Sequence, residues 1–192
     1  MPKPVLYHEN RFPPETINWE QLIPLLGPAN AAVARYDGAL AAVVNPAVLM
    51  SPLTTQEANR DEYYEKLLAI SCDGDWTGWC DFFLKALIAQ AEDNLDKTTK
   101  ILDLYGRMKL QIGKITRSPY GMIALDWIFT SPIFKAPDFA SHSGIPGATS
   151  RRILSAFRKA SILNQLSKPS GQKASIFVFS DLLNIAEGRN TF

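Results

Sequence analysis

The side chains best suited to binding chemistry are cations close together near the end of the chain. Two adjacent arginines are followed, seven residues on, by an Arg-Lys pair, and hydroxyl side chains precede the arginines. Guanidinium and ammonium groups neutralise phosphates, and hydroxyls donate hydrogen bonds to phosphates or base edges. The pattern predicts an anion-binding surface with DNA as the candidate partner. The predicted contact residues are Thr149, Ser150, Arg151, Arg152, Arg158 and Lys159, with Lys168 and Lys173 further on.

The charge distribution supports this interpretation. Residues 1–113 carry 10 Lys or Arg against 15 Asp or Glu, whereas residues 114–192 carry 10 against 4, and the whole chain has a net charge of +1. A basic part that follows an acidic part is typical of a protein with an anionic partner. Charge alone fits a basic face that contacts only solvent equally well.

Residues for catalysis or metal binding are sparse. His8 and His142 are the two histidines, and neither leads into a catalytic motif. Cys72 and Cys80 have no further Cys and no nearby His to complete a metal site, so we expect buried thiols. Neither a Gly-rich phosphate loop nor a G-x-S-x-G motif occurs. The residues therefore predict no catalytic, nucleotide-binding or metal site.

The elements that would position the cations lie in a region that we place at residues 114–192. SPYGMIALDWIFTSP, PDFASHSG and GATSRRILSAFRKASIL are predicted helices, the last of which carries the arginines. ILNQL and ASIFVF are predicted strands on either side of a polar, Gly-containing turn. The inward side chains of the first helix are expected to be Met122, Ile123, Leu125, Ile128 and Phe129.

Three helices followed by a two-stranded β wing form the pattern of a winged helix-turn-helix. In such domains the second helix of the turn motif lies in the DNA major groove. Winged helices also serve as dimerisation and docking modules, so a structural or protein-binding role stays open beside DNA binding.

The N-terminal region, residues 1–58, is predicted to be a layer of helices. Asn18 is a good N-cap for the first helix, Gly27 would end that helix, and Pro28 would begin the next. Asn45, followed by Pro46, is expected to cap a short turn that runs through Leu49. The fold class is therefore mainly α.

The middle region, residues 59–113, is predicted to contain one long amphipathic helix or two helices nearly in line. Asp75 is a plausible N-cap, and from residue 76 to residue 112 apolar positions recur at every third or fourth residue. We expect Asp73 and Asp81 to be solvated rather than to bind a metal. The aromatic side chains expected in the core are Trp76, Trp79, Phe82 and Phe83.

Composition and hydropathy limit the cellular compartments in which the chain is expected. It is 46% hydrophobic and 20% charged over 192 residues, which is ordinary for a globular protein. No apolar run reaches the roughly 20 residues of a membrane span, and MPKPVLYHENRFPPE lacks the apolar stretch of a signal peptide. We expect a cytoplasmic protein with no membrane partner.

Several segments resemble the Fic family, enzymes that transfer AMP from ATP to a hydroxyl side chain of a target protein. INWEQLIPLLGPANAAVARYDGAL and NPAVLMSPLTTQEA are similar to the family's N-terminal helical region. YYEKLLAISCDGDWTGWCDFFLKAL and the terminal winged helix are similar to segments that follow the catalytic core. The resemblance runs from about Phe12 to Asn184, and ARYDG, SPL..QEA and GDW..W..FFL occur in the family's order.

The resemblance also implies a catalytic motif that this sequence does not have. In the family, His-Pro-Phe-x-Asp/Glu-Gly-Asn-Gly-Arg-x-x-Arg supplies a general base, a Mg²⁺ ligand and a phosphate cradle. That motif and the family's inhibitory helix are absent, and Glu187-Gly-Arg-Asn shares only letters with it. We interpret the chain as a relative with an internal deletion between about Ala58 and Tyr63. It is predicted to be inactive and to bind no cofactor, although ATP and Mg²⁺ serve the intact family.

The predicted junction explains a helix with little to bury. SPLTTQEANRDEYYEKLLAI begins with a good cap at Ser51, yet Ala58 is the only apolar residue from Thr54 to Glu62. Three roles stay open beside that of a gene remnant. The chain could be an inactive adenylyltransferase, a DNA-binding regulator, or an interaction protein that pairs with itself or with an intact Fic protein.

Overall fold

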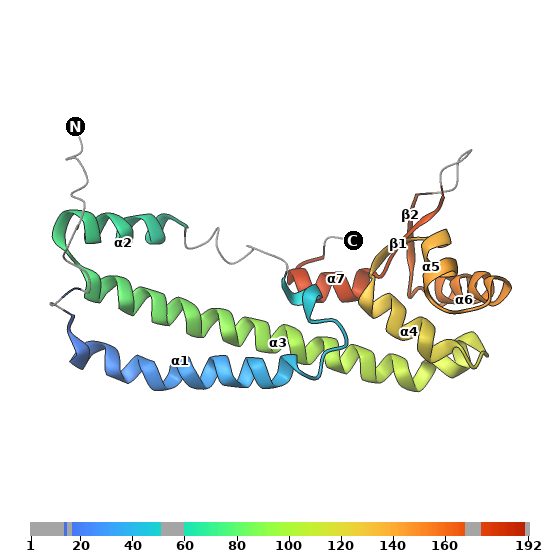
Figure 1. Cartoon of the computed structure of the whole chain (residues 1–192), viewed down its shortest axis with the longest axis horizontal. Helices are drawn as coiled ribbons and strands as arrows, with labels where there is room; N and C mark the ends of the chain where they lie inside the picture. Colours follow the sequence, from blue (N-terminus) through green and yellow to red (C-terminus); the bar gives the residue numbers. More distant parts are fainter. Residues whose placement is uncertain (1–13, 15–16, 51–59, 168–173, 191–192) are drawn as a thin grey trace. The chain divides into compact units, whose positions relative to one another are not determined.

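The structure, a computed structural model, describes residues 14, 17–50, 60–167 and 174–190 (Figure 1). It is mainly helical with one small three-stranded antiparallel sheet, which confirms the predicted mainly α class. The chain divides into two compact units, which we call unit 1 (residues 1–39 and 52–95) and unit 2 (residues 40–51 and 96–192). In the described part, no helix has the length and apolarity required to cross a membrane.

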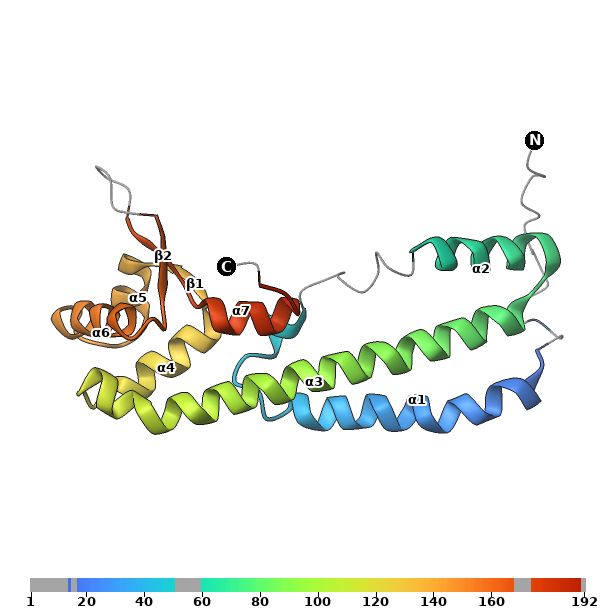
Figure 2. The same ribbon diagram turned by 180° about the vertical axis from the view of Figure 1, so that it is seen from behind.

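Unit 1 contains α1 (Trp19–Leu40) up to residue 39, α2 (Arg60–Asp73) and the first part of α3 (Trp76–Thr116). α1 runs beside the first part of α3 in both views (Figures 1 and 2). The predicted cap of α1 is confirmed, because the backbone N–H of Gln21 donates to Asn18 Oδ1 over 3.3 Å. The backbone N–H of Asn18 in turn donates to Thr77 Oγ1 on α3, over 2.9 Å.

The predicted break at Gly27 and Pro28 is wrong, because α1 continues through both Pro24 and Pro28. Each proline removes one helical hydrogen bond, to the carbonyl four residues earlier. Both prolines and Glu20 are exposed, so the carbonyls left without an N–H partner face water. Buried side chains on a different face of α1 hold the helix in place: Leu22, Ala29 and Ala32.

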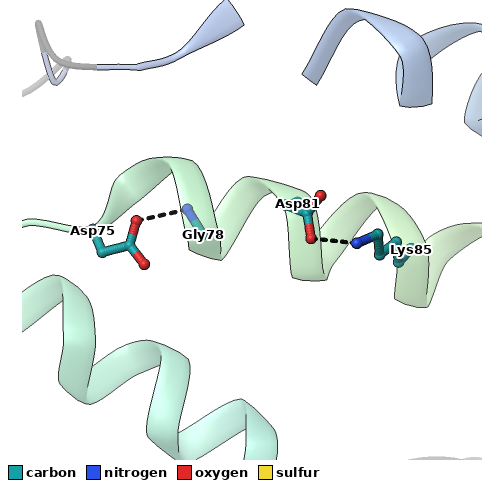
Figure 3. Close-up of polar contacts among 4 residues, drawn as sticks. All are labelled: Asp75, Gly78, Asp81 and Lys85. Atoms are coloured by element: carbon teal, nitrogen blue, oxygen red, sulfur yellow. Dashed lines mark hydrogen bonds and ion pairs between the residues drawn. The ribbon is translucent and has the colours of Figure 1, made fainter. Parts of the chain in front are cut away.

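The predicted start of α3 is confirmed (Figure 3). The backbone N–H of Gly78 donates to Asp75 Oδ1 over 2.8 Å, which is an N-cap hydrogen bond. Asp81 forms an ion pair with Lys85 one turn later, at 2.8 Å. These carboxylates therefore act in local helix contacts, and α3 is one continuous helix, as one of the two predicted arrangements required.

Unit 1 buries few apolar side chains. In its described part only Leu22, Ala29, Ala32, Ile70 and Ala91 are buried hydrophobic residues. A half-exposed aromatic row joins α2 to α3, with ring centroids 5.4 Å apart between Tyr63 and Trp79 and 5.9 Å apart between Trp79 and Phe82. The predicted burial of Phe83 is wrong, because 54% of its surface is exposed.

Unit 2 continues with the second part of α3 and then with seven elements in chain order. They are α4 (Gly121–Thr130), β1 (Ile133–Lys135), α5 (Ala136–His142), α6 (Gly147–Lys159), β2 (Asn164–Ser167), β3 (Ile176–Val178) and α7 (Ser180–Glu187). β3 lies between the other two strands and is antiparallel to both. The three predicted helices and two predicted strands are present. β1 and α7 were not predicted, and β1 makes the sheet three-stranded rather than two-stranded.

The core of unit 2 is rich in aromatic rings. Phe139, Phe157 and Phe179 are fully buried, and they come from α5, α6 and the residue after β3. Trp127 packs edge to face on Phe139, with centroids 5.0 Å apart, and it packs in the same way on Phe134. These contacts join α4, β1, α5 and α6 into one packed body. Among the side chains predicted to point inward from α4, the prediction for Ile123 is wrong, because 46% of its surface is exposed.

A short segment from the N-terminal half of the sequence completes unit 2. The 3₁₀ helix η1 (Pro46–Met50) lies against α7, and Leu49 is buried in the unit 2 core. Asn45 Nδ2 donates to the carbonyl of Thr130 at the end of α4 over 2.8 Å, and Asn45 Oδ1 accepts from the backbone N–H of Ala47. The predicted cap at Asn45 is thus confirmed, and the residue also holds η1 to α4.

Candidate nucleic-acid interface

α5 and α6 are joined by a tight turn of four residues, 143–146. Gly144 has φ +71°, a left-handed conformation that glycine adopts without steric cost. Ile145 is buried and anchors the turn in the core, while its backbone N–H bonds to Ser143 Oγ over 3.3 Å. The turn therefore fixes where α6 begins relative to α5.

α6 has one buried face and one exposed face. Ser150, Ile153, Leu154 and Phe157 are buried, at positions three or four residues apart. The buried residues set the rotation of the helix, because Phe157 and Ile153 are fully enclosed. The opposite face must then point away from the core.

The exposed face carries all four predicted cations of α6. Arg151, Arg152, Arg158 and Lys159 are exposed, and α6 has no acidic residue. In the part of the chain that the structure describes, none of the four forms an ion pair with a carboxylate. Their charge is therefore available to an external anion.

The other predicted contact residues differ in position. Thr149 is half-buried at the flank of the exposed face. Ser150 is fully buried, and its Oγ donates to the carbonyl of Ile145 over 3.0 Å, so it holds the turn in place and does not face solvent. Lys168 and Lys173 lie outside the described residues.

Sequence reasoning missed Ser155, which is exposed in the middle of the cationic face. It lies four residues after Arg151 and three before Arg158, a spacing that places all three on one side of a helix. Helical spacing counted from the arginines would have found it. Its hydroxyl can donate to a phosphate oxygen or a base edge between the cations.

The two strands after α6, β2 and β3, are held together by side-chain hydrogen bonds. Gln165 Nε2 donates to Ser175 Oγ over 3.1 Å, and the backbone N–H of Ile176 donates to Ser167 Oγ over 3.3 Å. Asn164 Nδ2 donates to Ser180 Oγ at the start of α7. These bonds hold β2 against β3 and against the start of α7.

Other reactive side chains do not gather into a site. Cys72 is exposed and Cys80 is half-buried, so the expectation of two buried thiols is wrong. His142 is exposed, with Nδ1 3.0 Å from the carbonyl of Asp138, and His8 lies outside the described residues. Within the described ranges, no group of three His, Cys, Asp or Glu side chains is placed to hold a metal ion.

The chain matches no protein-family model and no curated protein.

Proposed function

We propose that unit 2 is a winged helix-turn-helix domain that binds duplex DNA, with α6 in the major groove. Support comes from α5 and α6, which are joined by a four-residue turn as in a helix-turn-helix, and from the antiparallel strands β2 and β3 that follow them. The single observation that supports DNA as the ligand is the exposed face of α6, where four cations lie around Ser155 and none is paired with a carboxylate of the residues that the structure describes.

The position of each cation along α6 assigns its role. The N-terminal residues of a recognition helix contact base edges, so Thr149, Arg151 and Arg152 read sequence. Arg158 and Lys159, in the last turn, neutralise phosphates and fix the register on the duplex. Loss of an N-terminal arginine should therefore change sequence preference, whereas loss of a C-terminal cation should weaken binding to all sequences alike.

The proposed binding is tested by selecting a preferred duplex for the wild type from a random pool and then titrating that labelled duplex at low salt by fluorescence anisotropy. We expect Arg151→Ala with Arg152→Ala to lower affinity at least about tenfold, since each good base contact contributes about 1–3 kcal/mol. The matched control is Lys85→Ala with Lys100→Ala, which removes two cations that are already paired with Asp81 and Asp96. Equal affinities for the two double variants, or no binding by the wild type, would overturn the proposal.

We also propose that the chain is a Fic-type protein without its catalytic module and has no adenylyltransferase activity. The support is the sequence alone, in which the family's catalytic motif is missing between the matching segments. The purified chain, incubated with labelled ATP, Mg²⁺ and a cell lysate, should transfer no more label than a sample lacking the chain. Label on the chain or on a lysate protein above that background would contradict this.

A further inference from the structure

α1 carries an exposed apolar stripe on one side. The exposed fractions are 58% for Trp19, 62% for Ile23, 44% for Leu26 and 39% for Val33. The spacings of four, three and seven residues place these side chains along one line of the helix. A row of this kind on the surface of a protein marks an interaction site rather than scattered exposure.

The side chains next to the stripe leave room for another helix. Gly27, Ala31, Ala34 and Gly38 follow one flank, and no described atom lies within 4 Å of the place where a Cβ would stand at Gly27 or Gly38. Small residues let two helices approach closely. Arg35, the only cation of α1, falls on the opposite side of the helix wheel. An anionic ligand such as nucleic acid or a lipid headgroup therefore has nothing to bind on this side.

We propose that this stripe is covered by the same stripe of a second copy of the chain, with the two α1 helices antiparallel. Asn30 and Asp37 lie on the same line of the helix as the four apolar residues. The positions along this line are then 19, 23, 26, 30, 33 and 37, and their spacings are the same in both chain directions. A two-fold axis near residue 28 pairs Ile23 with Val33 of the second copy and Leu26 with Asn30 of the second copy. One surface thus complements itself, as a two-fold interface requires.

The polar ends of the stripe are complementary as well. In this register Trp19 lies opposite Asp37 of the second copy, and the arrangement occurs twice by symmetry. The indole N–H is a donor without acceptor capacity, and a carboxylate is an acceptor. A parallel pairing would instead place Asp37 against Asp37, with two like charges together. The Trp19–Asp37 contact and the repulsion between two Asp37 side chains in a parallel pair therefore both favour the antiparallel arrangement.

The size of the face sets the strength of the contact. A helix of 22 residues is about 33 Å long and 10–12 Å wide, so one copy covers roughly 350 Å² in projection. Stable interfaces use about 800 Å² per partner. The predicted product is a weak, reversible dimer that forms as concentration rises.

Sedimentation velocity of the full chain over a concentration series tests the proposal. The wild type should shift from monomer to dimer, and Ile23→Glu should move the midpoint at least about tenfold higher, because a charge would be buried without a partner. The matched control is Leu110→Glu on α3, at a side chain that is 82% exposed and is not part of the stripe, which should leave the midpoint unchanged. A chain that stays monomeric at every concentration overturns the proposal and leaves the stripe to a different protein.

Cross-linking tests the antiparallel register. In a background with Cys72→Ser and Cys80→Ser, a mixture of Leu26→Cys and Asn30→Cys chains should form a mixed disulfide dimer faster than either variant alone. Disulfide dimers of Leu26→Cys alone at the faster rate would show a parallel pair and contradict the register.

Discussion

The two units differ in how many of their apolar side chains are buried. Unit 2 holds 22 of the 27 buried hydrophobic residues that the described ranges contain, and unit 1 holds five. Of the 13 exposed large hydrophobic residues in the same ranges, eight belong to unit 1. Folding of unit 2 is thus supported by its own core, whereas unit 1 leaves apolar surface uncovered.

The contrast separates two kinds of function. In unit 2 the buried face of α6 fixes the position of an exposed cationic face, which suits a rigid binding surface. In unit 1 the exposed side chains lie along α1, where they suit contact with another chain. Unit 2 therefore presents a charged surface, and unit 1 presents an apolar surface that suits contact with another chain.

The largest predicted effect comes from truncating an aromatic ring in each unit. Phe157→Ala, in the core of unit 2, should lower the free energy of unfolding by about 3–5 kcal/mol, because it leaves a cavity. Phe83→Ala, at a half-exposed ring of unit 1, should change it by less than about 0.5 kcal/mol. Urea denaturation followed by circular dichroism measures both. Equal losses of unfolding free energy in the two variants would contradict the proposed difference between the units.

A smaller effect is expected at the contact of Asn45 with the end of α4, within unit 2. Asn45→Ala removes the bond to the Thr130 carbonyl and the cap at Ala47, so the unit 2 transition should lose about 1–2 kcal/mol. Asn45→Asp keeps the acceptor for Ala47 but sets a negative charge at the C-terminal end of α4, and should cost at least as much. If Asn45→Asp restored wild-type stability, the contact with α4 would be unimportant.

The smallest effect concerns alkaline pH. Tyr105 Oη donates to Asp126 Oδ1 over 2.6 Å, and this bond, then burial, then the Asp126 charge raise the pKa of Tyr105 to about 12. Because the folded pKa lies above the unfolded value of 10.0, the contribution is complete below pH 10 and is lost as pH rises toward 12. Tyr105→Phe should therefore lose less stability than the wild type between these pH values. Parallel pH profiles of the urea midpoint would contradict this.

Periodicity and turn signals predicted the helices around the cationic face but not every neighbour. The helix carrying Arg151 and Arg152 was identified from its apolar spacing, and the hairpin after it from a polar Gly-containing turn. β1 was missed because three residues directly before a helix give too few alternations to indicate a strand. The burial of Ser150 was missed because its partner, the Ile145 carbonyl, exists only once the turn has formed.

The errors in unit 1 have a different cause. Phe83 and the α1 stripe have the spacing of core residues, yet little of the described chain packs on them. Periodicity shows which side chains share a face and does not show whether that face has a partner. Pro28 was predicted to begin a helix because proline lacks the N–H that a helix interior uses. In the structure Pro28 lies on a solvent-facing side of α1, where the missing N–H matters little. The sequence does not show which side of the helix faces solvent. The segment around Ser51, expected at the deletion junction, lies outside the described residues.

The central claim is that the cationic face of α6 binds duplex DNA through Arg151 and Arg152. The most direct test is the salt dependence of duplex affinity, measured for the wild type and for Arg151→Ala with Arg152→Ala. Each phosphate neutralised contributes about −0.9 to the slope of log K against log salt. The affinity of the double variant should fall, and its slope should become shallower by up to about 2, because each arginine also places one positive charge beside the phosphates. A wild type whose duplex affinity and salt slope match those of the double variant would contradict the account.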